Sequence, residues 1–231
     1  LKIGITGQNG FIGYHLLQTI KFTREDSSIV LFERSFLNDS KALGSFVSSC
    51  DVIVHLAGVN RSETDEQVYD DNIKINSLLK KALIGTNFKG HLLFASSSQE
   101  NGNSLYGKAK KESREFFEKT INSLEGKFTG LIIPNVFGPF CKPNYNSFVA
   151  TFCSKILNNE TPEVIQDTNV PLLYVGNLIE QILEVIRDPK GSLIEIRPDL
   201  EVKVTEVLHL LNTFKDSYLD SNTIPSLQTP F

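Results

Sequence analysis

The stretch Thr6–Gly13, which reads TGQNGFIG, decides the fold class of this 231-residue chain. It follows the short apolar segment Lys2–Thr6 and leads into Phe11–Thr23, where apolar residues recur at helical spacing. Glycines in the pattern Gly-x-x-Gly-x-x-Gly allow a tight turn close to a pyrophosphate, and the helix N-terminus offers unpaired N–H groups to that anion. We therefore predict a dinucleotide-binding loop made of Gly7, Asn9, Gly10, Phe11, Ile12 and Gly13.

Strand-like and helix-like segments alternate up to Pro134, which is typical of βαβ units around a mostly parallel sheet. Further strands are expected at residues 29–32, 51–56, 91–95 and 128–133, and helices at about 69–84 and 106–122. After Pro134, prolines punctuate shorter segments. We expect an α/β fold with a Rossmann-type doubly wound parallel sheet. Residues 1–134 would form the dinucleotide-binding core, and residues 135–231 mainly a smaller C-terminal substrate-binding lobe and tail.

Composition excludes several classes of protein. A formal net charge of −4 argues against a nucleic-acid partner. No apolar run reaches the roughly 18 residues that a membrane helix needs. Three cysteines without CxxC spacing and four scattered histidines match no metal site, so we expect no metal. The first residues read as a strand rather than a signal peptide, and a cytoplasmic location is expected.

The end of the second expected strand, Glu33-Arg34, bears on cofactor choice. An acid at this place usually binds the ribose hydroxyls of NAD, whereas an arginine accommodates the 2′-phosphate of NADP. Arg34 can stack on adenine and pair with phosphate, so NADPH is the favoured cofactor.

A tyrosine and a lysine four residues apart, Tyr106 and Lys110, share one face of an expected helix. A phenol has an ordinary pKa of about 10, and a nearby ammonium stabilises its ionised form. Ser98 ends a serine run after the preceding strand, where its hydroxyl could polarise a substrate carbonyl. We predict that Ser98, Tyr106 and Lys110 are catalytic.

These motifs together resemble the extended short-chain dehydrogenase/reductase superfamily. The matching pieces are TGxxGFxG at 6–13, HLAG at 55–58, DNI at 71–73, the serines at 96–98, YGxxK at 106–110 and PNVFGP at 134–139. The resemblance implies that Tyr106 and Lys110 also hold the nicotinamide ribose and that Asn135 contacts a substrate diphosphate. It implies further cofactor contacts from Leu56, Ala57, Gly58 and Asn72.

Two longer stretches, HLAGVNR at 55–61 and CKPNYNS at 141–147, resemble the capsular polysaccharide enzymes of the CapF/WbjC type. That resemblance implies NADPH-dependent reduction of the C4 ketone of a UDP-4-keto-6-deoxy acetamido sugar, toward UDP-N-acetyl-L-fucosamine. In such enzymes a metal-containing C-terminal cupin domain, covalently linked, epimerises the sugar first. A cation and amide groups suit a diphosphate and sugar hydroxyls. The expected substrate-binding residues are Lys142, Asn144, Tyr145, Asn146 and Ser147.

Other functions stay open at this stage. A nucleotide-sugar epimerase or dehydratase with tightly held NAD is the nearest alternative, although no Asp-Glu pair follows the serine run where a dehydratase keeps its acid and base. A non-catalytic NADP-sensing regulator could use the same fold. The resemblance to the extended short-chain dehydrogenases/reductases also implies a homodimer.

Overall fold

The computed structural model describes residues 1–23, 27–145 and 147–224. The chain divides into two compact units. The first contains Leu1–Pro134 and Val175–Arg197, and the second contains Asn135–Tyr174 and the residues from Pro198 onward. Residues 175–197 lie beyond the boundary expected after Pro134 and belong to the first unit, whose sheet they complete.

The first unit is built on a six-stranded parallel sheet in the order β2-β1-β3-β4-β5-β8. Its strands are β1 (Lys2–Thr6), β2 (Ser28–Val30), β3 (Val52–His55), β4 (His91–Ser97), β5 (Lys127–Ile133) and β8 (Leu193–Glu195). The predicted α/β, Rossmann-type fold is confirmed. The chain order reverses between β1 and β3, and ligands of such folds bind at the carboxyl ends of the strands beside this reversal.

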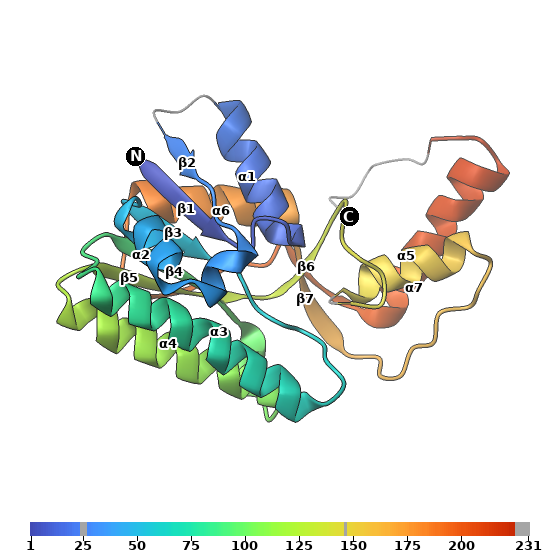
Figure 1. Ribbon diagram of the computed structural model, residues 1–231. Helices are drawn as coiled ribbons and strands as arrows, with labels where there is room; N and C mark the ends of the chain where they lie inside the picture. The colour runs from blue at the N-terminus through green and yellow to red at the C-terminus, as the bar shows by residue number, and fades with distance from the viewer. Residues whose placement is uncertain (24–26, 146, 225–231) are drawn as a thin grey trace. The chain divides into compact units, whose positions relative to one another are not determined.

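Helices cover both faces of this sheet (Figure 1). On one side α1 (Phe11–Thr23) contacts α6 (Val175–Arg187). On the other side α2 (Ser40–Ser48), α3 (Asp65–Gly85) and α4 (Leu105–Ser123) lie next to one another. Two short 3-10 helices, η1 (Arg34–Asn38) and η2 (Ser98–Asn101), follow β2 and β4.

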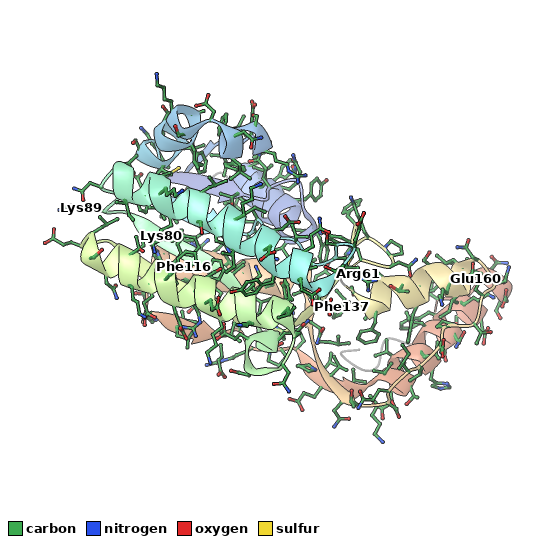
Figure 2. The ribbon with its side chains drawn as sticks, turned by 60° about the horizontal axis from the view of Figure 1, so that its bottom comes forward. Arg61, Lys80, Lys89, Phe116, Phe137 and Glu160 are labelled. Atoms are coloured by element: carbon green, nitrogen blue, oxygen red, sulfur yellow. The ribbon has the colours of Figure 1, made fainter. Side chains whose placement is uncertain are left out.

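The main core lies between the sheet and α2, α3 and α4. Its apolar side chains interlock in one continuous cluster, in which Phe94 of β4 and Phe117 of α4 are fully buried and 5.3 Å apart by ring centroids. On the outer side of the same helices, Lys80 of α3 lies 5.0 Å from the ring centroid of Phe116 of α4 (Figure 2). These contacts hold α4, which carries the predicted Tyr–Lys pair, against the sheet and against α3.

Two segments of the first unit were not predicted as helices. In α2, the Asp39 carboxylate caps the helix by accepting from the backbone N–H groups of Lys41 and Ala42, at 2.9 and 3.0 Å. After Pro134 the sequence predicts only short segments, but α6 runs for 13 residues. Most of its apolar side chains are buried, and this burial draws the segment back to the first unit.

The second strand is shorter than expected, because it ends at Val30 rather than Phe32. Beyond Val30 the backbone of Phe32 makes its hydrogen bonds with the Gln8 side chain instead of with a neighbouring strand. Its Nε2 donates to the Phe32 carbonyl at 2.9 Å, and its Oε1 accepts from the Phe32 amide at 3.4 Å. Arg34 therefore does not end a strand but begins η1.

The second unit contains a three-stranded sheet in the order β6-β7-β9. β6 (Asn135–Phe137) is parallel to β7 (Asn169–Tyr174), and β9 (Leu200–Lys203) is antiparallel to it. Helix α5 (Phe148–Leu157) contacts α7 (Val204–Lys215), which continues into η3 (Asp216–Asp220). Across the part of the chain that the structure describes, no helix combines the length and apolar character needed to cross a membrane.

We expect Phe117→Ala to destabilise the first unit by about 3–5 kcal/mol, because it opens a cavity in the main core. Phe22→Ala is the matched control, since the Phe22 side chain is 80% exposed, and its effect should stay within about 0.5 kcal/mol. Urea unfolding followed by circular dichroism measures both. Equal effects of the two substitutions would contradict the assignment of Phe117 to the core.

Candidate active site

The glycine loop lies between β1 and α1, at the carboxyl end of β1. Gly7 has a φ of +76°, a left-handed conformation that favours glycine, and its carbonyl accepts from the Gly10 amide at 2.9 Å. A Cβ built at Gly13 would lie 2.2 Å from the Gly7 carbonyl oxygen, and one at Gly7 would lie 2.8 Å from the backbone nitrogen of Ala57. The chain therefore forms a close-packed turn without side chains, which fits the pyrophosphate of a dinucleotide.

The remaining predicted loop residues sit around this turn. Asn9 and Gly10 are exposed, whereas Phe11 and Ile12 are half-buried in the first turn of α1. Arg34 is exposed at the start of η1, just beyond the Phe32 backbone that Gln8 holds. Sequence reasoning missed Gln8, although its place inside the glycine motif marks it as a residue near the loop.

The segment after β3 is fixed from two sides. The Ala57 amide donates to the Thr6 hydroxyl at 3.3 Å. The buried Asn72 side chain of α3 accepts from the Val59 amide at 3.1 Å and donates to the Val59 carbonyl at 2.7 Å. Asn72 thus shapes the predicted cofactor segment through the backbone, and Leu56 and Ala57 stay half-buried beside the glycine loop.

Lys110 is buried directly behind Gly58. Its Nζ donates to the Ala95 carbonyl at 3.0 Å and lies 5.2 Å from the ring centroid of Phe94. A Cβ built at Gly58 would lie 3.2 Å from this Nζ, so the missing side chain leaves room for the ammonium. Burial lowers the pKa of Lys110 to about 8. This value is still above 7, so the charged form predominates at neutral pH.

Tyr106 and Lys110 come together as the spacing predicted, with the Lys110 Nζ 5.6 Å from the tyrosine ring centroid. Tyr106 is half-buried in the first turn of α4. Ser98 is exposed as the first residue of η2, directly after β4. A Cβ at Gly107 would lie 2.0 Å from the carbonyl oxygen of Gln99, so the segment that carries Ser98 packs tightly on the turn that carries Tyr106.

A buried series of hydrogen-bonded polar side chains connects β1, β3, α3 and α4 beside the site. His55, 1% exposed, pairs through Nδ1 with the Thr6 hydroxyl at 2.5 Å and through Nε2 with the Asn76 oxygen at 2.7 Å. The Asn76 amide then donates to Ser113 of α4 at 2.7 Å. Because the Thr6 hydroxyl already accepts from Ala57, it donates its own proton to the Nδ1 of His55. The neutral His55 with its proton on Nε2 then satisfies every group in this series of hydrogen bonds.

Burial is the main cause that lowers the pKa of His55 to about 4, and the nearby Lys110 charge acts in the same direction against the Asn76 hydrogen bond. The imidazole is therefore neutral throughout the physiological range. Sequence reasoning placed His55 at the strand end but missed its partners. Asn72 and Asn76, four residues apart on one helix face, were the available signal.

The predicted substrate-binding residues lie in the second unit. Asn135 begins β6 and is half-buried, and Lys142 and Tyr145 are exposed. Asn144 has a φ of +55°, and its backbone N–H donates to the Thr151 hydroxyl at 2.9 Å. Ser147 precedes α5 as its N-cap residue. Asn146 lies outside the described residues, so the structure leaves that prediction where it stood.

No group of three or more His, Cys, Asp or Glu side chains that could hold a metal occurs within residues 1–23, 27–145 and 147–224. The three cysteines are free thiols.

The model of the NAD dependent epimerase/dehydratase family matches residues 3–196. The chain belongs to this family. A curated relative, the UDP-2-acetamido-2,6-beta-L-arabino-hexul-4-ose reductase of Pseudomonas aeruginosa, is 29% identical over 230 residues, which cover 94% of this chain and 58% of the relative. The resemblance to extended short-chain dehydrogenases/reductases is thereby confirmed.

Solved structures agree with this placement. The capsular polysaccharide assembling protein CapF of Staphylococcus aureus is 30% identical with a TM-score of 0.78, over 99% of this chain and 61% of that protein. The UDP-glucose 4-epimerase of Thermotoga maritima, 20% identical with a TM-score of 0.80 over 93% of this chain and 82% of its own, shares the fold. The chain spans about three fifths of the length of the CapF and Pseudomonas relatives.

We expect the buried histidines to make the chain acid-sensitive. A histidine in the unfolded chain takes up a proton near pH 6.5, whereas burial lowers the pKa of both His55 and His91 to about 4. The contribution of these two histidines to the free energy of unfolding is therefore fully present above pH 6.5 and is lost as the pH falls toward 4. At about 1.4 kcal/mol per pKa unit, each histidine contributes roughly 3 kcal/mol of that loss.

Urea unfolding between pH 4.5 and 7.5 measures this slope. His55→Gln should make it shallower, and His91→Gln is the matched control with the same titration but no place in the site. If the stability of His55→Gln depends on pH as steeply as that of the parent, the neutral, buried state of His55 is contradicted.

Proposed function

We propose that this chain is the reductase module of a nucleotide-sugar enzyme. It uses NADPH to reduce the C4 ketone of a UDP-4-keto-6-deoxy acetamido sugar, in the formation of UDP-N-acetyl-L-fucosamine for capsule or O-antigen polysaccharide. The observation that carries the proposal is the burial of Lys110 between Gly58 and the first turn of α4, with Tyr106 at its side. The printed activity of the Pseudomonas relative and the likeness to CapF support the substrate class.

Each residue has a distinct task in this reaction. Tyr106 donates a proton to the oxygen of the reduced carbonyl, while the Lys110 ammonium stabilises the phenolate that remains. Ser98 donates a hydrogen bond to the carbonyl oxygen as negative charge develops there. Gly7, Gly10 and Gly13 hold the dinucleotide diphosphate, and Arg34 holds the 2′-phosphate. Bound NADPH supplies the hydride.

The dehydratase alternative is disfavoured by the residues after Ser98. Gln99 stands where such an enzyme would keep an acid, and the Glu100 carboxylate is buried and paired with Arg114 at 3.1 Å. Its oxygens already accept hydrogen bonds from Arg114 and Ser96, so this carboxylate is not free to meet a substrate. Homodimer formation, a linked cupin domain and a cytoplasmic location remain predictions from the sequence.

Tyr106→Phe should lower kcat by about 10²-fold or more, because it removes the proton donor, while NADPH binding persists. Tyr69→Phe is the matched control: Tyr69 lies on α3 and donates to Glu112, and neither residue belongs to the predicted site. Turnover of the UDP-4-keto sugar and calorimetric titration with NADPH measure the two effects. Unchanged turnover in Tyr106→Phe would favour the sensing regulator.

Arg34→Ala should weaken NADPH binding by about 10-fold or more and leave NADH binding unchanged, because a charge-assisted hydrogen bond contributes about 1.5–3 kcal/mol. Calorimetric titration with the two cofactors separates the effects. If the parent chain instead prefers NADH, or retains NAD through purification, the reductase proposal fails and the NAD-dependent epimerase reading takes its place.

The pH dependence of kcat/KM should show an alkaline limb near pH 8. Burial lowers the pKa of Lys110 to about 8, so its ammonium is lost as the pH rises through that value, and kcat/KM reports the groups of the free enzyme. Lys110→Arg, which stays charged, should remove the limb at a reduced overall rate. A parent profile that is flat to pH 9.5 would contradict this role of Lys110.

A further inference from the structure

A buried ion pair lies beside Ser98, and one of its members, Glu100, is two residues further along the chain. Arg114 of α4 donates through Nε to both oxygens of Glu100 in η2, at 3.1 Å each. The side chains are 11% and 5% exposed. Ser96 of β4 donates to the same carboxylate at 2.5 Å. The pair thus joins the end of β4, the short helix η2 and the middle of α4.

The arginine reaches this place because a neighbouring strand makes room for it. A Cβ built at Gly130 of β5 would lie 2.7 Å from the Arg114 Cδ. The other carboxylates near this guanidinium, on Glu115 and Glu118, are 4.0 and 3.9 Å away and more exposed, at 45% and 30%. Glu100 is therefore the partner that defines the position of Arg114.

The pair clamps the segment that presents Ser98. Glu100 lies two residues after Ser98 and Ser96 two residues before it, so both flanks of the serine are anchored to one carboxylate. Other contacts hold the same segment. The Ser97 hydroxyl accepts from the backbone N–H of Gln99 at 3.2 Å, and the backbone carbonyl of Gln99 accepts from the N–H of Gly102 at 2.9 Å. Ser98 itself is exposed, which leaves its hydroxyl available to a ligand.

Buried ion pairs are weak sources of stability, because the loss of hydration offsets most of the attraction between the charges. Their directional hydrogen bonds nevertheless select one arrangement of the elements that they join. Tyr106, Lys110 and Arg114 recur every four residues along α4, so a pair at Arg114 sets the distance of η2 from the helix that carries the other two site residues.

We propose that Glu100 and Arg114 are positioning residues that place the Ser98 hydroxyl relative to Tyr106 and Lys110. The catalytic part of this inference rests on the proposed reductase function. The placement itself is a property of the fold and does not depend on that function.

The placement is tested first by hydrogen exchange of the backbone amides in residues 96–104. The test variant is Glu100→Gln with Arg114→Met, which removes both charges and so leaves neither one buried alone. We expect exchange in this segment to quicken at least 10-fold, with β1 and β3 unchanged. Glu125→Gln breaks the exposed Lys89–Glu125 pair, 2.7 Å, and serves as control. Unchanged exchange in residues 96–104 would overturn the proposal.

A double-mutant cycle with Ser98→Ala then tests the catalytic consequence. Misplacement of a reacting group by about 1 Å can cost about 10²-fold, so Glu100→Gln should lower kcat at least 10-fold with the KM for NADPH unchanged. In the Ser98→Ala background the same substitution should cost less than about twofold, because the group that it positions is gone. Arg114→Lys, which keeps the charge, should restore part of the rate relative to Arg114→Met.

The outcomes separate the two proposals. If the parent chain reduces no UDP-4-keto sugar, the proposed function fails, and hydrogen exchange alone still decides the placement. If the parent is active and Glu100→Gln lowers kcat equally with and without Ser98, the pair has a general structural role and the positioning proposal is overturned.

Discussion

The hydrogen bond between the side chains of Thr6 and His55 is the contact on which the site depends. It joins the last residues of β1 and β3, the two parallel strands between which the order of the sheet reverses. The same threonine hydroxyl accepts from Ala57, so the turn after β3 is directed across the turn after β1. Gly7 has no side chain to obstruct this crossing. The glycine loop and the segment at residues 56–58 are thereby built as one surface.

Several polar side chains lie on the buried side of α4, and their contacts explain how the helix is oriented. Tyr106, Lys110, Ser113 and Arg114 lie along one side of the helix at spacings of three and four residues. Each of the last three is bound by a different element: Lys110 by β4, Ser113 by α3 and Arg114 by η2. Three directional contacts in a row fix both the rotation and the height of the helix, which apolar packing alone would leave less tightly specified.

The two buried charged groups on this face have different surroundings, and the difference matches the roles proposed for them. Arg114 is neutralised by a carboxylate with matching geometry, as suits a permanent structural contact. Lys110 has a backbone carbonyl and the aromatic rings of Phe94 and Tyr106 beside it. Its burial penalty is therefore only partly offset, and its pKa falls. A group held in this state responds strongly to any change of charge at the neighbouring phenol.

The sequence by itself determined the local features of this protein: the glycine loop with β1 and α1 around it, the alternation that predicts a parallel sheet, and the approach of Tyr106 to Lys110. These follow from spacings of a few residues, which strand and helix geometry convert directly into positions. It did not determine the end of β2, the return of residues 175–197 to the first sheet, or the partners of His55 and Glu100. The end of β2, the partners of His55 and the pairing of Glu100 with Arg114 depend on groups 14 to 49 residues apart, and the pairing of β8 with β5 joins residues 63 apart. Only the packing of the sheet against its helices brings such groups within hydrogen-bonding distance.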